Sequence, residues 1–458
     1  MFTMKGIDLM LKKSMAIMAS LLFAAATVGC SEAANISVNE TVSTSTVRTE
    51  SIDTDEMTAT AADETSETEA SAETSESSVS SDTVEVAELS TSSNGATDTT
   101  DMFTERDLTQ TPDLTEAQYL EAMSSEDIEI TSEGVYVISG TASDCTISVN
   151  APDDAKVQLV LDDLSITNTS DAAILVTSCD KVFVTASGDS SLSVTGEFEA
   201  VDDMNVDAVI YSKSDLVLNG TGTLSIDSTA NGVTSKDDMK MTGGTYNVTT
   251  TLDSFEANDS ICIAGGEFNI TSGKDAFNCE NSDDNTLGNI YIADGTFNIS
   301  ATSDGIQGTT VVQIDGGTFD ITSAEGIEGT YVQINGGTIN ITASDDGINA
   351  TSKSTAYSVA AEFNGGDITI VMGQGDTDGV DSNGSIYVNG GTINITAQMS
   401  SFDYDNEAQL NGGTVIINGE QVTDIPQSMM GGGMGGAMNG GMGGGMSDFG
   451  GRRRGGMA

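Results

Sequence analysis

The chain has 458 residues, no histidine or tryptophan, three prolines, 51 glycines and a formal net charge of −56. Without imidazole, the sequence excludes Ser-His-Asp and Cys-His nucleophiles, a histidine general base and the ordinary histidine-bearing zinc site. The negative charge argues against nucleic acid or anionic lipid as a direct partner of the folded body, and favours cations.

The first thirty residues predict an export signal. Lys5, Lys12 and Lys13 precede an apolar run over residues 16–28, which is shorter than the roughly 20 residues that a spanning helix needs. The run ends in Thr-Val-Gly-Cys, which resembles a bacterial lipobox whose cysteine, Cys30, would carry the lipid. Cleavage by an ordinary signal peptidase and a retained membrane anchor are the alternatives. We therefore expect an extracellular lipoprotein that contacts the membrane only through its lipid.

Segments of biased composition flank the body. Residues 31–110 are dominated by Ser, Thr, Glu, Asp and Ala and predict a disordered linker, while residues 426–458 predict a disordered tail rich in Gly and Met. Residues 111–127 predict a short helix that covers one end of the body. Asp113 would cap this helix, and apolar residues recur at helical spacing at Leu114, Ala117, Leu120 and Met123.

One phrase recurs through residues 128–425. It contains alternating apolar residues around Gly-Gly-Thr, followed several residues later by Asp, a small residue and an apolar residue. Most successive doublets lie 20 to 25 residues apart, which suits one coil of a β-helix. The sequence therefore predicts an all-β fold, a right-handed parallel β-helix solenoid of about ten coils. The doublets begin at Gly243, Gly265, Gly316, Gly336, Gly365, Gly390 and Gly412, with Asp294-Gly295 as a variant.

Alternation of apolar residues around each doublet predicts two interior columns, because equivalent residues of successive coils stack. The first column would contain Tyr246, Phe268, Phe297, Phe319, Ile339, Ile368 and Ile393. The second would contain Val248, Ile270, Ile299, Ile321, Ile341, Ile370 and Ile395.

Acidic and amide side chains recur about nine residues after each doublet, and again three residues later. Stacked coils would place them in a column at intervals of about 4.8 Å. Two unit charges about 4 Å apart repel by ~4 kcal/mol at an effective dielectric of 20, so either protonation or a bound cation must relieve the column. Oxygen-only donors favour calcium, and turn capping by Asp and Asn is the alternative. The candidate ligands are Asp253, Glu256, Asp275, Asp304, Glu325, Glu328, Asp346, Asp378, Asp381 and Asp403.

Three tyrosines alternate out of phase with their apolar neighbours, so we expect Tyr291, Tyr331 and Tyr387 to face outward. Exposed rings could stack on sugars, and ordinary strand surface is the alternative. The same alternation turns Cys262 outward, although the cysteine spacing fixes no disulfide pairing.

The Gly-Gly-Thr phrase with its Asp-Gly-Ile partner, as at residues 304–306 and 346–348, resembles secreted carbohydrate-binding β-helix proteins with a fold similar to that of pectate lyases. The resemblance implies calcium and acidic or plant-type polysaccharides as ligands. Lyases of this fold use an arginine or lysine base; residues 128–425 contain no arginine, but Lys274 adjoins Asp275. We expect a monomeric polysaccharide-binding protein that does not bind nucleic acid. A calcium-dependent lyase and a non-catalytic adhesin or envelope protein are the alternatives.

Overall fold

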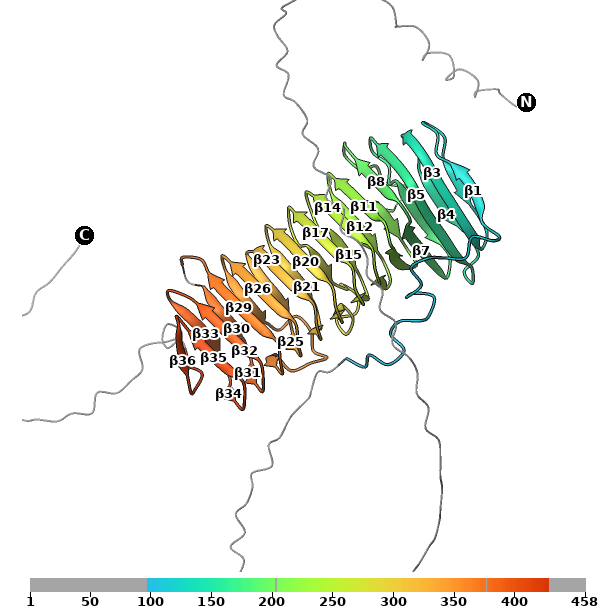
Figure 1. Cartoon of the computed structure of the whole chain (residues 1–458). Coiled ribbons are helices and arrows are strands. Elements are labelled where there is room, and N and C mark those ends of the chain that lie inside the picture. The colour runs from blue at the N-terminus through green and yellow to red at the C-terminus, as the bar shows by residue number, and fades with distance from the viewer. Residues whose placement is uncertain (1–96, 202–203, 376, 428–458) are drawn as a thin grey trace, which may run out of the picture. The chain divides into compact units, whose positions relative to one another are not determined.

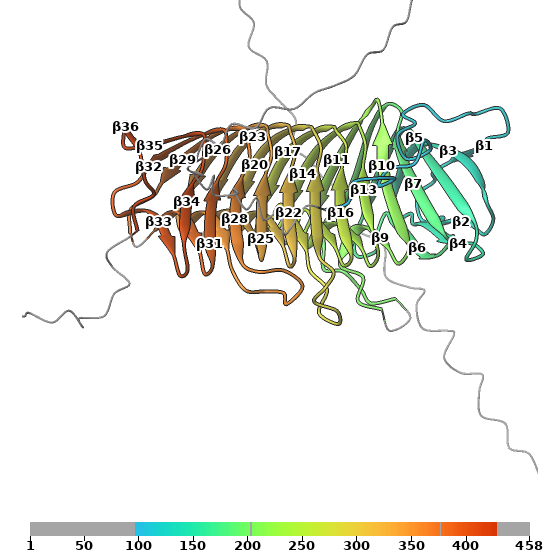
Figure 2. The ribbon, with the colours of Figure 1, turned by 90° about the horizontal axis from the view of Figure 1, so that it is seen from below.

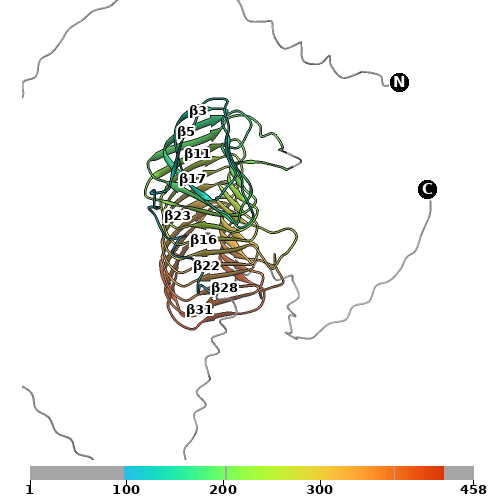
Figure 3. The same cartoon turned by 90° about the vertical axis from the view of Figure 1, so that its right-hand side faces the viewer.

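Each repeat of the sequence forms one coil of a parallel β-helix, and a typical coil has three short strands joined by turns (Figures 1 and 2). The computed structural model describes residues 97–201, 204–375 and 377–427. The coils lie behind one another when the molecule is seen from the end that holds β1 (Figure 3). The expected all-β solenoid is confirmed, with twelve coils in the described residues rather than about ten.

The strands define three faces. Face 1 consists of β2 (Ile128–Ile130), β4 (Ile147–Asn150), β6 (Ile174–Ser178), β9 (Ala208–Ser212), β12 (Asn231–Ser235), β15 (Phe255–Ala257), β18 (Phe277–Cys279), β21 (Asp304–Gly308), β24 (Glu325–Gly329), β27 (Asp346–Ala350), β30 (Asp378–Ser382) and β33 (Ser400–Tyr404). Face 2 consists of β7 (Lys181–Ala186), β10 (Asp215–Gly220), β13 (Met239–Met241), β16 (Ser260–Ile263), β19 (Asn289–Ile292), β22 (Val311–Ile314), β25 (Tyr331–Ile334), β28 (Ala360–Phe363), β31 (Ser385–Val388) and β34 (Ala408–Leu410). Face 3 consists of β8 (Asp189–Val194), β11 (Thr223–Ser228), β14 (Thr245–Thr250), β17 (Glu267–Ser272), β20 (Thr296–Ala301), β23 (Thr318–Ser323), β26 (Thr338–Ala343), β29 (Asp367–Met372), β32 (Thr392–Thr396) and β35 (Thr414–Ile417).

Long strands at the N-terminal end join faces 2 and 3 into one sheet. The strands β1 (Gln118–Glu121), β3 (Gly134–Ser143) and β5 (Lys156–Asn168) pair in parallel, and β5 then pairs with both β7 and β8. At the other end β36 (Glu420–Val422) folds back antiparallel on β35.

The core is the inside of the solenoid, and both predicted columns are confirmed. Their residues pair in register from coil to coil and are buried. The rings of Phe268, Phe297 and Phe319 stack nearly parallel, with centroids 4.9 Å and 4.4 Å apart. Parallel stacking at the coil spacing keeps successive coils in one register, which is what aligns the side chains on the outer faces.

The predicted capping helix at residues 111–127 is wrong, because the second half of this segment forms β1 along the open edge of β3. Asp113 does accept a hydrogen bond from the amide of Thr115, at 2.9 Å, but the turn does not continue as a helix. The unpaired edge of β3 offers backbone hydrogen bonds, and such pairing outweighs a weak helical preference.

Residues 97–110 form an ordered strap across face 2, so the predicted disordered linker ends earlier than residue 110. Asp107 in this strap is fully buried, and its carboxylate lies 3.6 Å from Nζ of Lys181 and 3.8 Å from Nζ of Lys240. The side chain of Gln110 accepts a hydrogen bond from the amide of Gly220. Residues 31–96 lie outside the described residues, as do the signal segment with Cys30 and residues 428–458 of the predicted tail.

Replacing Asp107 with alanine should release the strap. Removing one partner of a buried ion pair lowers the stability of the fold by about 3–5 kcal/mol. In this variant Lys181 and Lys240 would lose the carboxylate that they share. Cys262 is buried beneath the strap, so we expect a thiol reagent to label it about tenfold faster or more in Asp107→Ala. Mass spectrometry of labelled peptides measures this rate. Asp98→Ala, in an exposed part of the strap, is the matched control, and equal labelling in both variants would contradict the prediction.

All four cysteines in the described residues are buried and unpaired: Cys145, Cys179, Cys262 and Cys279. The described residues include no helix long and apolar enough to cross a membrane.

Candidate functional site

Two adjacent columns of oxygen-bearing side chains run along face 1, and we call them together the acidic ladder. The first column contains Asn231, Asp253, Asp275, Asp304, Glu325, Asp346 and Asp378. The second contains Thr234, Glu256, Asn278, Gln307, Glu328, Asn349, Asp381 and Asp403. The expected stacking is confirmed, with one change: Asp403 pairs with Asp381 in the second column, and Ser400 takes the first-column position of that coil.

Each position of the ladder within one coil is a rung. In four rungs of the first column, a side-chain oxygen accepts a hydrogen bond from a backbone amide of the next coil. The amide of Asp275 donates to Oδ1 of Asp253 at 2.9 Å, and the amide of Asp304 donates to Oδ1 of Asp275 at 2.9 Å. Asn231 and Asp346 accept equivalent bonds from the coils that follow them. Backbone capping, the structural alternative for these residues, therefore applies to one oxygen of each. The three aspartates keep a second carboxylate oxygen for other partners, whereas the amide of Asn231 has no second oxygen.

Lysines neutralise the N-terminal part of the ladder. Lys274 lies 2.9 Å from a carboxylate oxygen of Asp253 and 3.3 Å from one of Asp275. Lys236 pairs with Glu256 at 3.3 Å, and Lys353 pairs with Glu328 at 2.5 Å.

Three acids in the C-terminal part of the ladder lack such a lysine partner among the described residues. Within the described residues, Asp346, Asp381 and Asp403 form no ion pair with lysine or arginine. Burial, together with the charges of Asp381 and Glu325, raises the pKa of Asp346 to about 7. Burial and the charges of Asp378 and Asp403 raise the pKa of Asp381 to about 6. A raised carboxyl pKa means that the ionised form is disfavoured here unless a cation joins it.

Asp304 lies one coil before Glu325 and Glu328 and is buried. Burial, then the charges of Asp275 and Glu325, raise its pKa to about 8. Burial also raises the pKa of Glu325, the next rung of the first column.

Two amide rungs add neutral oxygen donors to the second column. The buried Oδ1 atoms of Asn278 and Asn349 have no hydrogen-bond partner among the described residues. Asn349 lies next to Asp381 in the second column. The side-chain amide nitrogen of Asn349 donates a hydrogen bond to Glu325 at 2.9 Å. A buried acceptor without a partner is costly, and a hard cation that takes carbonyl and carboxylate oxygens fits this donor set.

The structure contains a second carboxylate cluster that was not predicted from the sequence. Asp215, Asp237 and Asp238 bring one oxygen each within 4.8 Å of one another, and burial raises the pKa of Asp215 and Asp237. The cluster lies between faces 1 and 2, where Lys181 pairs with Asp215 at 3.3 Å. The consecutive acids Asp237 and Asp238 were the available signal, but their approach to Asp215 depends on coil stacking.

The expected exposure of the tyrosines is wrong for two of them. Tyr291 is buried beneath the strap and donates a hydrogen bond to Asp315 at 2.9 Å. Tyr331 is buried beside Tyr357, in the connection between β27 and β28, and its hydroxyl donates to Glu362. Their rings do point away from the core, but other segments cover them. Tyr387 is partly exposed and stays a predicted sugar platform.

The glycine of the Asp-Gly-Ile motif lies where the backbones of two successive coils come too close for a side chain. A Cβ on Gly347 would lie 2.5 Å from the carbonyl oxygen of Gly379 and 2.5 Å from Cγ2 of Ile370. Gly326 meets the carbonyl oxygen of Gly347 at 2.3 Å in the same way. The motif therefore combines a ladder carboxylate with a residue that lets the next coil approach closely.

Gly347→Ala should destabilise the protein by about 1–3 kcal/mol, because the backbone of the adjacent coil must shift. Thermal unfolding measures the loss. Gly265→Ala is the matched control, since a Cβ there meets nothing within 4 Å. Equal melting temperatures for the two variants would show that the close approach at Gly347 does not limit stability.

Comparisons with known proteins identify the family. A family model described as carbohydrate-binding domain-containing protein matches residues 124–379, which include most of the acidic ladder. A carbohydrate-binding domain-containing protein of Acetivibrio thermocellus is 34% identical over 128 residues, or 27% of this chain and 45% of that relative, so the match spans less than half of the relative's length. A solved polysaccharide lyase-like protein from C. thermocellum is 21% identical, with a TM-score of 0.30 over 65% of this chain and 96% of that one. Because the family model matches more than half of its residues, the chain belongs to this carbohydrate-binding domain family.

Proposed function

We propose that the protein binds acidic polysaccharide through calcium ions held by the acidic ladder. The observation that carries this proposal is the C-terminal part of the ladder, where Asp346 lies in the first column, Asp381 and Asp403 stack in the second, and none of the three pairs with a described lysine or arginine. The donors would be these carboxylates with Asp378 and the amide oxygen of Asn349. All are oxygen atoms, which calcium accepts in irregular geometry.

Calcium would supply the positive charge that the surface lacks. A polymer of uronic acids would otherwise be repelled by a chain of formal net charge −56. An ion with ligand positions left over can join a ladder carboxylate to a uronate carboxylate. The repeat of the ladder would then bind successive units of the polymer, and each weak contact would add to the avidity of the whole.

Lyase chemistry has less support than binding. Lys274 is the lysine that pairs with two ladder acids. Although burial opposes it, the hydrogen bond to Asp253 and the charges of Asp253 and Asp275 raise the pKa of Lys274 well above its usual range. A general base must be neutral at the working pH, so this lysine is poorly suited to remove a proton.

Export as a surface lipoprotein belongs to the same proposal. The signal segment would place the solenoid outside the cell, where calcium and polysaccharide are both accessible, and lipid on Cys30 would anchor it. Metabolic labelling with a radioactive fatty acid tests the anchor: Cys30→Ala should remove the label from the protein.

A sedimentation assay with cross-linked polygalacturonate tests the binding. The protein should bind in calcium, stay in solution in excess chelator and bind again when calcium is restored. Magnesium at the same concentration controls for ionic strength, because it keeps its water and demands a stricter geometry. Equal binding with and without chelator would refute the role of calcium. Release of an ultraviolet-absorbing unsaturated product would instead establish a lyase.

A further inference from the structure

Face 3 carries a regular polar surface that the acidic ladder does not involve. The strands β14, β17, β20, β23 and β26 each have six residues, and their first, third and fifth side chains point outward in three rows, which we call the polar lattice. Successive strands pair in register, so each row crosses five coils. Neighbouring side chains in a row are about 4.8 Å apart, and the rows are about 7 Å apart.

The polar lattice is almost uncharged. Of its fifteen positions only Glu267 and Asp320 carry a charge, in a chain of formal net charge −56. The other positions carry hydroxyl or amide groups. This face therefore has neither the density of carboxylates that would hold cations nor the basic groups that would pair with an acidic polymer.

The hydroxyls of the lattice are available to a ligand. The side chains of Thr249, Thr271 and Thr322 make no hydrogen bond with any part of the chain that the structure describes. Threonines in the turns differ from these lattice threonines, because the hydroxyls of Thr310 and Thr330 donate hydrogen bonds to backbone carbonyls. The lattice thus presents donors and acceptors that the fold does not use.

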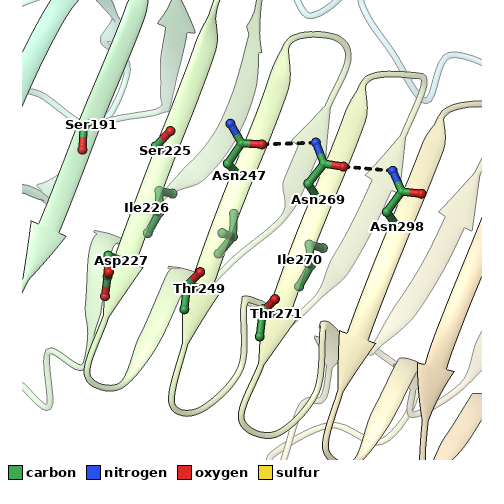
Figure 4. Close-up of a pocket in the computed structure, with 11 residues that line it drawn as sticks. Ser191, Ser225, Ile226, Asp227, Asn247, Thr249, Asn269, Ile270, Thr271 and Asn298 are labelled. Carbon is green, nitrogen blue, oxygen red and sulfur yellow. Dashed lines mark hydrogen bonds between the residues drawn. The ribbon is translucent and has the colours of Figure 1, made fainter.

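The middle row is held rigid by its own amides. The amide nitrogen of Asn269 donates to Asn247 at 3.1 Å, and that of Asn298 donates to Asn269 at 2.9 Å (Figure 4). Asn269 gives its second N–H to Glu267 at 3.3 Å, whereas Asn247 and Asn298 each keep an N–H that can face a ligand. A shallow hollow of about 490 Å³ lies beside these two rows and extends past the lattice onto β11, where Ser225 and the single carboxylate Asp227 line it (Figure 4).

We propose that the polar lattice is a second polysaccharide-binding surface, which takes an uncharged polymer extended across the coils and needs no calcium. Sugar hydroxyls match the exposed hydroxyls and amides, and the low charge of the face selects a neutral chain over a uronate chain. No aromatic ring points outward from the five strands, so the ligand is bound by its hydroxyl edge rather than by ring stacking. Because each hydrogen bond to an exposed hydroxyl is weak, affinity requires many contacts along a polymer.

This inference rests on the family assignment and not on the calcium proposal, so the two can fail separately. The assay measures binding of the mature chain to insoluble mannan and to regenerated cellulose in excess chelator. The wild-type protein should bind at least one of these polymers and should not be displaced by short oligosaccharides of the same sugar. Absence of binding to both polymers would overturn the proposal.

Variants assign the binding to the lattice. Thr249→Ala, Thr271→Ala and Thr322→Ala combined should weaken binding about tenfold or more, because three hydroxyls that would hydrogen-bond the polymer are removed. The same variant should keep its melting temperature and its calcium-dependent binding to polygalacturonate. The matched control removes three exposed hydroxyls outside the polar lattice that also make no hydrogen bond with the described residues, at Thr131, Ser187 and Ser344. Equal affinity of the two triple variants for the neutral polymer would show that the lattice is not the binding surface.

Discussion

Stripped of calcium, the protein should unfold at a lower temperature at about pH 8 than at about pH 5. The pKa values of Asp304, Asp346 and Asp381 are raised in the folded protein to about 8, about 7 and about 6, first by burial and then by neighbouring carboxylates. A raised folded-state pKa means that the folded protein binds more protons than the unfolded chain. The stability that protonation contributes is full below the ordinary value of 3.8 and is lost as the pH rises through these three values.

Calcium should reverse this dependence. The ion binds the deprotonated carboxylates, so it competes with protons at pH 5 and meets little competition at pH 8. One site filled at a thousand times its dissociation constant adds about 4 kcal/mol to the free energy of unfolding. Differential scanning calorimetry across this pH range, with and without calcium, measures both effects. A metal-free protein that is most stable at pH 8, or that calcium leaves unchanged there, would contradict the proposed relief of the ladder.

The coil repeat and the core could be predicted from the sequence because they depend on local alternation. Phe268, Phe297 and Phe319 recur at matched positions, and stacking in register follows directly. The same alternation gave the outward direction of Tyr291 and Tyr331 correctly. It could not predict their burial, because the covering strap and the connection that holds Tyr357 come from distant parts of the chain.

The existence of the acidic ladder could also be predicted from the repeat of the sequence. The column to which each acid belongs depends on the strand register. Asp403 follows its glycine doublet by twelve residues, and only strand pairing shows that it joins Asp381 in the second column. The split between a lysine-neutralised part and an uncompensated part is likewise invisible in the sequence, because Lys353 reaches Glu328 across the stack of coils. Of the ten acids predicted as ligands, those in the last coils, Asp346, Asp378, Asp381 and Asp403, are therefore the ones that we propose as the cation site.

Replacing both Asp346 and Asp381 with asparagine should separate stability from function. Asparagine already occupies ladder rungs at Asn278 and Asn349, so the stack tolerates an amide of the same shape. Removing two charges whose ionisation is disfavoured should raise the melting temperature of the metal-free protein at about pH 8 by several degrees. The same change should abolish most of the stabilisation by calcium and weaken calcium-dependent binding to polygalacturonate by about a factor of 100, which corresponds to about 2.8 kcal/mol.

Asp320→Asn is the matched control for this double variant. It makes the same chemical change on face 3, where Asp320 is exposed in a row that is otherwise mostly asparagine. Calorimetry and the sedimentation assay should therefore give wild-type values for it. If the double variant keeps the calcium response, the ions bind elsewhere, and the cluster of Asp215, Asp237 and Asp238 becomes the next set to replace. If it loses the calcium response but still binds polygalacturonate in chelator, calcium stabilises the solenoid without bridging the ligand, because bridging requires both effects to depend on the same carboxylates.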